Sequence, residues 1–111
     1  MDQDAIDKVV AELRAKFPEG AYDLVSLDIR AGLFVLRNPA HNEHMLYKKM
    51  ILDESQQAIA SHNLFVATCV YPEPSLVQAA LKRFPGLLMH DKVQKAFRFL
   101  SGQSDTLEGK S

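Results

Sequence analysis

Two histidines come closest to the spacing of a functional site in this chain of 111 residues. His41 and His44 stand three positions apart at the start of a predicted helix, so both imidazoles could face one ion. A zinc site needs further ligands, and no other ligand stands at a recognisable spacing. The neighbours Ser61 and His62 do not form a nucleophile–base pair, because adjacent residues of a helix point in different directions. We therefore interpret His41 and His44 as surface or capping residues.

The single cysteine, Cys69, lies in the most apolar stretch of the chain. Burial raises the pKa of a thiol and makes it unreactive, so we interpret Cys69 as a small core residue. One cysteine cannot form an internal disulfide, which is typical of a protein from a reducing compartment. The glycines are isolated from one another and match no phosphate-binding loop. We expect no enzyme here, and no catalytic, cofactor-binding or metal-binding residues.

Charge and hydropathy limit the classes of partner. Thirteen basic and fourteen acidic residues leave a net charge of −1, so no positive field favours nucleic acid or an anionic membrane. The longest apolar run, Leu64–Val70, is far shorter than the ~20 residues that span a bilayer. The acidic start Met1–Asp4 is unlike a signal peptide. We expect a soluble cytoplasmic protein that contacts neither nucleic acid nor a membrane.

The elements that would position any site begin with a helix and a hairpin. Apolar residues recur at helical spacing over Gln3–Lys16, where Asp2 or Asp4 can cap the helix. Pro18 then stops this helix. Apolar and polar residues alternate after it, which predicts a β-hairpin over Tyr22–Arg37.

The chain then turns helical. Asn38 resembles an N-cap, followed by Pro39 at the first position of a helix that runs to about Leu52. Asp53, with Gln56 three residues later, predicts a new helix that continues to about Val70. The apolar stretch at its end also fits a buried strand. We favour the helix, because the polar residues before this stretch show no strand alternation.

Prolines divide the remainder into two further helices. The segment Pro72–Pro74 predicts a rigid corner, from which a short helix runs to Phe84. Pro85–Gly86 breaks that helix, and a final helix is predicted over Leu87–Leu100. The polar segment at 102–111 predicts a disordered tail. The predicted class is therefore α+β, mainly α, with an N-terminal helix, a β-hairpin and a bundle of about four helices in one domain over residues 1–101.

Methionine and leucine residues indicate a candidate binding surface. The face running from Met45 to Leu52 and the run at 87–89 carry more apolar residues than a small domain can cover, although internal packing is the alternative interpretation. The flexible methionine thioether adapts to partners of different shape. The candidate partner-binding residues are Met45, Met50, Leu87, Leu88 and Met89.

Several of these signals, in this order, resemble the small tail assembly chaperones of long-tailed bacteriophages. The hairpin ends in Leu36-Arg37-Asn38-Pro39 and leads into a helix with Tyr47, and later come Cys69-Val70-Tyr71-Pro72 and Phe84-Pro85-Gly86-Leu87. The resemblance covers roughly residues 20–101, and its motifs are structural corners rather than catalytic residues. Asn38 and the histidine-rich segment Ala40–His44 depart from the basic residues that the family pattern places after the proline.

The resemblance implies that the protein acts by binding another protein and not by catalysis. Members of this family bind the long, helical tape measure protein in the host cytoplasm, keep it soluble and promote tail-tube assembly. They commonly self-associate, so a homo-oligomer is expected, and they leave before the virion matures. Two alternatives stay open: a structural head–tail connector or tail completion protein of the virion, and a small bacterial adaptor unrelated to phage.

Overall fold

The computed structural model describes residues 2–103 and 105. Over these residues the chain forms five α-helices, two short 3-10 helices and a three-stranded antiparallel sheet. In chain order the elements are α1 (Gln3–Leu13), β1 (Leu24–Ile29), β2 (Gly32–Arg37), α2 (His41–Ile51), η1 (Glu54–Gln56), α3 (Gln57–Thr68), β3 (Cys69–Tyr71), α4 (Pro74–Arg83), η2 (Leu87–Met89) and α5 (Asp91–Leu100). The predicted α+β class, mainly α, is confirmed.

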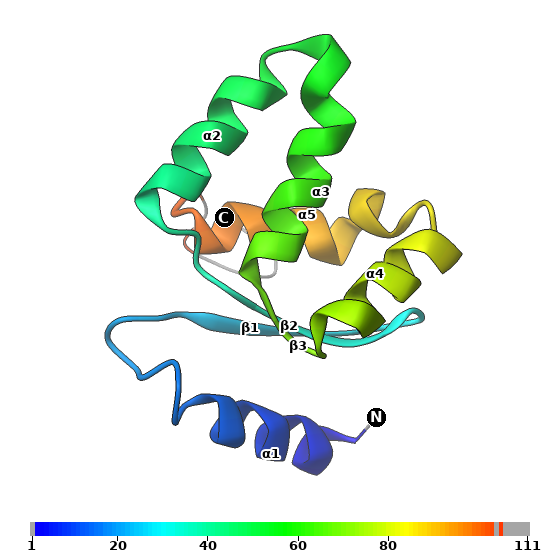
Figure 1. Ribbon diagram of the computed structural model, residues 1–111. Coiled ribbons are helices and arrows are strands. Elements are labelled where there is room, and N and C mark those ends of the chain that lie inside the picture. The colour runs from blue at the N-terminus through cyan, green and yellow to red at the C-terminus, as the bar shows by residue number, and fades with distance from the viewer. Residues whose placement is uncertain (1, 104, 106–111) are drawn as a thin grey trace.

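The sheet has helices on both of its faces. Its strand order is β1-β2-β3, with β2 in the centre. Successive residues of a strand point to opposite faces, so Phe34 and Leu36 face one side and Leu33 and Val35 the other. None of these four side chains is more than 7% exposed. Helix α1 covers one face, and α3, α4 and α5 lie on the other (Figure 1).

The main core lies between the sheet and the three helices on that second face. Phe65 of α3 is fully buried at its centre, and its ring lies edge-on to Phe34 at 5.6 Å and to Phe97 at 6.5 Å between centroids. Such edge-to-face contacts are favourable for aromatic rings. The buried members of this cluster are Val25, Leu27, Phe34, Leu36, Leu64, Phe65, Val77, Leu87, Val93, Ala96, Phe97 and Leu100.

The N-terminal helix and the hairpin follow the prediction closely. The Asp2 carboxylate accepts a hydrogen bond from the Ala5 N–H at 2.8 Å and caps α1. The helix ends at Leu13, three residues before the predicted boundary, because Arg14 closes the turn by donating to the carbonyl of Tyr22 at 2.8 Å. Gly32 has φ 130°, a conformation that favours glycine, directly after the tight turn between β1 and β2.

The predicted N-cap of the second helix is wrong. Helix α2 begins at His41, and the Asn38 side chain instead accepts a hydrogen bond from the Asp23 N–H at 3.2 Å. Asn38 therefore extends the pairing of the hairpin ends. The start of α2 is instead capped by a residue of the helix itself, because the Glu43 carboxylate accepts a hydrogen bond from the Ala40 N–H at 2.7 Å.

The predicted helix to Val70 is wrong in its last residues. Helix α3 ends at Thr68, and Cys69–Tyr71 form the half-buried strand β3, so the alternative of a strand over Leu64–Val70 is correct only for Cys69 and Val70. Strand β3 pairs with the side of β2 that the hairpin leaves open, with Leu36 opposite Cys69 and Val35 opposite Tyr71. By pairing with this edge, β3 gives hydrogen-bond partners to backbone groups of β2 that would have none if the chain continued as a helix.

The later boundaries agree with the predicted corners. Asp53 caps a 3-10 turn through the Ser55 N–H at 3.0 Å, and Pro74 occupies the first turn of α4. The predicted last helix divides into η2 and α5, because the His90 imidazole accepts from the Lys92 N–H at 3.1 Å and starts a new helix. Most of the predicted tail at 102–111 lies outside the described residues.

Candidate partner-binding surface

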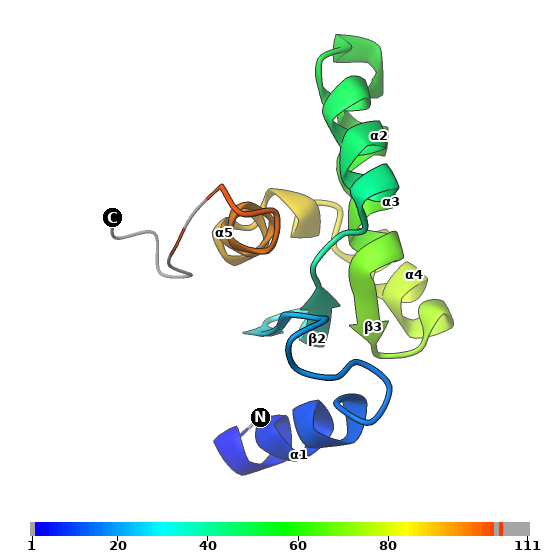
Figure 2. The same ribbon diagram turned by 90° about the vertical axis from the view of Figure 1, so that its left-hand side faces the viewer.

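Helices α2 and α3 form a helical hairpin that projects from the sheet. Figure 1 shows the two helices running antiparallel away from the strands, and Figure 2 shows them rising beyond the rest of the molecule. Helix α2 packs mainly on α3 and on η1, and it has no fully buried residue. Its side chains are therefore half-buried or exposed along its whole length.

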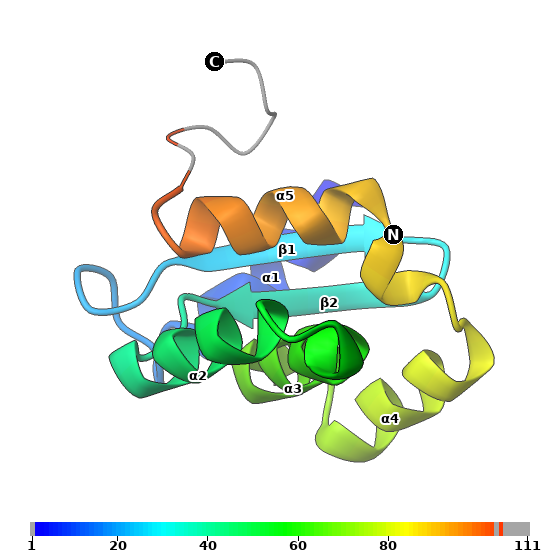
Figure 3. The ribbon, with the colours of Figure 1, turned by 90° about the horizontal axis from the view of Figure 1, so that it is seen from above.

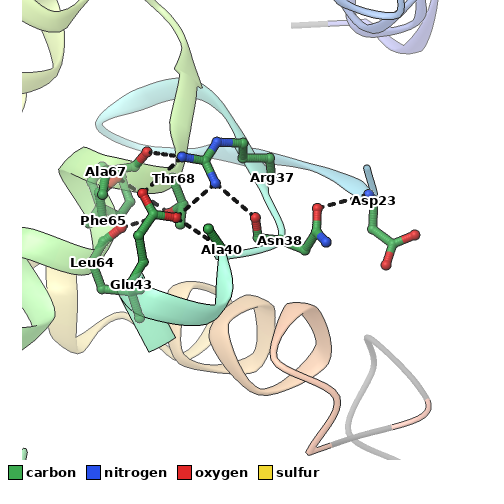
Figure 4. A network of polar contacts seen from close by, with 9 residues as sticks. All are labelled: Asp23, Arg37, Asn38, Ala40, Glu43, Leu64, Phe65, Ala67 and Thr68. Atoms are coloured by element: carbon green, nitrogen blue, oxygen red, sulfur yellow. Dashed lines mark hydrogen bonds and ion pairs between the residues drawn. The ribbon is translucent and has the colours of Figure 1, made fainter. Parts of the chain in front are cut away.

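Arg37, at the end of β2, fixes the base of this hairpin (Figure 4). Its guanidinium donates to both carboxylate oxygens of Glu43, at 2.9 and 3.0 Å, and to the Ala67 carbonyl at 2.9 Å. A further bond of 2.9 Å goes to the carbonyl of the next residue, Asn38. One side chain thus joins the sheet, the first turn of α2 and the last turn of α3.

The electrostatics of this contact favour the charged carboxylate. The hydrogen bonds from Arg37 lower the pKa of Glu43, partial burial opposes them, and the Ala40 N–H lowers the pKa further. Both side chains are largely covered, with 18% of Arg37 and 23% of Glu43 exposed. A bidentate arginine–carboxylate pair fixes direction as well as distance, so the hairpin is held in one orientation at its base. Tyr47 adds a second anchor, its ring 6.4 Å from that of Phe97.

Large apolar side chains are exposed on the hairpin. Leu52 stands at the turn between the helices with 84% of its surface exposed, and Met45, Leu46 and Ile59 are about half exposed, at 53%, 54% and 48%. We call these four residues the hairpin surface. Elsewhere in the described chain, exposed large apolar side chains are those of Leu76 and Met89.

A shallow groove of about 100 Å³ runs between the two helices beside this surface. Ile59, Asn63 and Ala67 are four residues apart on α3 and therefore lie along one side of that helix. The groove residues are Glu43, Leu46, Tyr47, Met50, Ala60, Asn63, Leu64 and Ala67. Its lining is mostly apolar, with Glu43 and Asn63 as its polar groups.

The structure separates the five residues predicted to bind a partner. Met45 lies on the hairpin surface, and half-buried Met50 lines the groove next to it. Leu87 is a core residue with 4% exposed, so it is not part of the hairpin surface. Leu88 also packs against the core, whereas Met89 is 79% exposed on η2, away from the hairpin.

The five candidate residues did not include Leu46 and Leu52, although both lie on the predicted face from Met45 to Leu52, and Ile59 was missed altogether. The signal for Leu52 was present, because it directly precedes the helix-capping residue Asp53. A leucine at the turn between two antiparallel helices projects beyond both of them, so neither can cover it. Ile59 carried no such signal, since α3 is apolar on several sides and the sequence does not show which side remains open.

The residues considered for chemistry belong to α2, α3 and β3. His41 is exposed and His44 partly exposed, and no three histidine, cysteine, aspartate or glutamate side chains of the described chain lie close enough to hold a metal together. Burial raises the pKa of the Cys69 thiol to about 11, and the thiol donates to the Tyr71 carbonyl at 3.1 Å. Cys69 is half-buried and packs against the main core, so it lies at the edge of the core and not inside it as the sequence predicted.

Comparisons with protein-family models, with curated proteins and with solved structures found no match. Within residues 2–103, none of the helices combines the length and the apolar character needed to cross a bilayer. The exposed apolar residues of the hairpin surface therefore provide the physical basis for a proposed function.

Proposed function

We propose that this protein is a non-catalytic tail assembly chaperone of a long-tailed bacteriophage, which binds helical segments of the tape measure protein. The observation that carries the proposal is the apolar hairpin surface on a helical pair that projects from the sheet. The partner is kept soluble in the host cytoplasm while the tail tube assembles around it. The chaperone is absent from the mature virion and acts as a homo-oligomer.

The hairpin surface suits an amphipathic helix. Such a helix buries its apolar face in a hydrophobic groove between two helices and leaves its polar face in water. Burying one leucine or methionine side chain contributes about 1.5–3 kcal/mol, so two or three such contacts give appreciable affinity. Met45 and Met50 can adjust to helices of different sequence, which a long partner with many similar segments requires.

Co-expression with a tape measure protein tests the proposal. We expect a soluble complex with the wild type, and at least about tenfold weaker binding for the Met45→Gln/Leu52→Gln variant, because two apolar contacts are lost. Met89→Gln, compared with the single variant Leu52→Gln, is the matched control, since Met89 is 79% and Leu52 84% exposed and Met89 lies outside the hairpin. Equal loss in both variants, or no complex with a tape measure protein that stays soluble alone, would contradict the proposal.

Two further observations separate the alternatives. Mass spectrometry of purified virions should not detect the protein, whereas a head–tail connector or tail completion protein would remain in the particle. The neighbouring genes should encode tail components. A locus without tail genes would favour the small bacterial adaptor.

A further inference from the structure

A second apolar groove lies at the opposite end of the sheet from the Arg37 contact, around Phe84. Two adjoining hollows of about 350 and 270 Å³ share the residues Ala31, Arg83 and Phe84. We call them together the Phe84 groove. Its walls come from the turn between β1 and β2, the last turns of α4 and the segment that enters η2. Figure 3 shows these parts at one end of the molecule.

Two arginines flank the aromatic ring of this groove. The guanidinium carbon of Arg83 lies 5.1 Å from the centroid of the Phe84 ring, and that of Arg30 lies 5.8 Å from it. A cation over an aromatic face is attracted to the ring, so both guanidinium groups are held near it. Both side chains are exposed, and their N–H groups can reach a ligand in the groove.

Neither arginine has an acidic partner within the described part of the chain. No acidic side chain lines either hollow in those residues. Arg37 differs in this respect, because two nitrogens of its guanidinium donate hydrogen bonds to the Glu43 carboxylate. The Phe84 groove therefore combines apolar walls with two guanidinium groups whose positive charge is not neutralised by an acidic side chain of the described chain.

We infer that the Phe84 groove binds an extended segment of a partner protein that places an aspartate or glutamate against the guanidinium of Arg83, which lines both hollows, while Arg30 adds positive charge at the smaller hollow. The planar guanidinium matches a carboxylate in two parallel hydrogen bonds, which gives direction as well as charge complementarity. Apolar side chains on either side of the acidic residue enter the two hollows. The inferred site is separate from the hairpin surface and does not depend on the proposed function.

Charge and shape favour an acidic peptide over nucleic acid. A nucleic-acid strand needs a row of cations that follows its phosphates, and the chain as a whole has a net charge of −1. The larger hollow is lined by Leu76, Ala79, Ala80 and Pro72, which contact apolar side chains rather than phosphates. The chemistry of the walls therefore selects a peptide with one acidic residue among apolar ones.

Selection from a library of short random peptides tests this inference. We expect the wild type to enrich peptides in which aspartate or glutamate has apolar neighbours, and the Arg30→Gln/Arg83→Gln variant to lose that enrichment. For a selected peptide, replacing its acidic residue by the matching amide should weaken binding at least about tenfold. Amide shifts in NMR should change around Phe84 and not around Leu52.

Matched variants make the result decisive. Lys48→Gln/Arg98→Gln removes the same charge from two other exposed residues and should leave peptide affinity unchanged. Met45→Gln/Leu52→Gln should also leave it unchanged, which separates this site from the proposed chaperone surface. The inference is overturned if acidic peptides are not enriched, if the charge-matched control loses as much affinity, or if a short single-stranded DNA competes as well as the peptide.

Discussion

The sheet-centred core and helix α2 of the hairpin differ in burial, which separates the part that stabilises the fold from the part that we propose for binding a helical partner. Strand β2 is covered on both faces, and its side chains from Leu33 to Leu36 are at most 7% exposed. Helix α2 has no buried residue and carries two of the large exposed apolar side chains, Met45 and Leu46. Binding surfaces are commonly drawn from the less stable parts of a fold, because residues that contact a partner cannot also be buried in the core.

The two regions also differ in what holds them. The sheet-centred core depends on packing among aromatic and branched side chains, with Phe65 at its centre. The base of the hairpin depends on the directional contact between Arg37 and Glu43 and on one aromatic contact. Substitutions in the two regions should therefore differ in size and in their response to pH.

The largest effect is expected in the core. Phe65→Ala should lower the free energy of unfolding by about 3–5 kcal/mol, because it removes the ring between Phe34 and Phe97 and leaves a cavity. Leu52→Ala, at an exposed position, should change it by less than about 0.5 kcal/mol. Urea unfolding followed by circular dichroism measures both. If Phe65→Ala does not fold, Phe65→Leu should still fold and lose about 1–2 kcal/mol. Similar values for Phe65→Leu and Leu52→Ala would remove the distinction between the regions.

A smaller effect is expected at the base of the hairpin. Arg37→Met removes the bidentate partner of Glu43 and should lower the free energy of unfolding by about 1–2 kcal/mol, since the partly buried carboxylate keeps only the Ala40 N–H. Lys95→Met breaks the exposed pair with Asp91 at 3.0 Å and should cause no measurable change. Urea unfolding of both variants under identical conditions checks this, and equal effects would show that the Arg37 contact has no special role.

The same contact should make stability depend on pH. The Arg37 guanidinium holds the pKa of Glu43 below its ordinary value of 4.5 in the folded state. Its contribution is therefore complete above about pH 4.5 and is lost as the pH falls through the lower folded value. Glu43→Gln should be less stable than the wild type near neutral pH, and this difference should shrink in acid. A difference that stays constant down to about pH 3 would contradict the assignment.

The smallest effect concerns a thiol at the edge of the core. Burial raises the pKa of Cys69 from 9.0 to about 11, so the thiol stays protonated at pH values where an exposed cysteine begins to ionise. The folded protein should react with an aromatic disulfide reagent much more slowly than the same protein in urea. Equal reaction rates in the two conditions would show that Cys69 is accessible in the folded state.

Elements with a regular local pattern could be predicted from the sequence. Helix α1 and the β1–β2 hairpin have clear periods of 3.6 and 2, and each forms within a short stretch of chain. Strand β3 could not be found in this way, because three residues carry no period and their partner, β2, is distant in sequence. The prediction of Asn38 as an N-cap was wrong for a related reason. Its side chain accepts a hydrogen bond from Asp23, across the hairpin, and does not cap the nearby helix.

The candidate surface was only partly predictable. The sequence indicated an excess of apolar residues near Met45 and near Leu87, and it could not show which of them the core would take. Leu87 and Met89 are two residues apart in a 3-10 turn, and one is 4% and the other 79% exposed. Such a choice depends on which side of the turn meets the sheet, and that is settled by tertiary packing.

The Arg37 contact also has a consequence for the order of folding. Arg37 meets Glu43 nearby in sequence, but its bond to Ala67 closes a loop of 30 residues. Closing such a loop carries an entropic cost, whereas the turn between α2 and α3 is local and can form early. We therefore expect the Arg37–Ala67 contact to form late in folding, so loss of Arg37 should accelerate unfolding and leave the refolding rate almost unchanged.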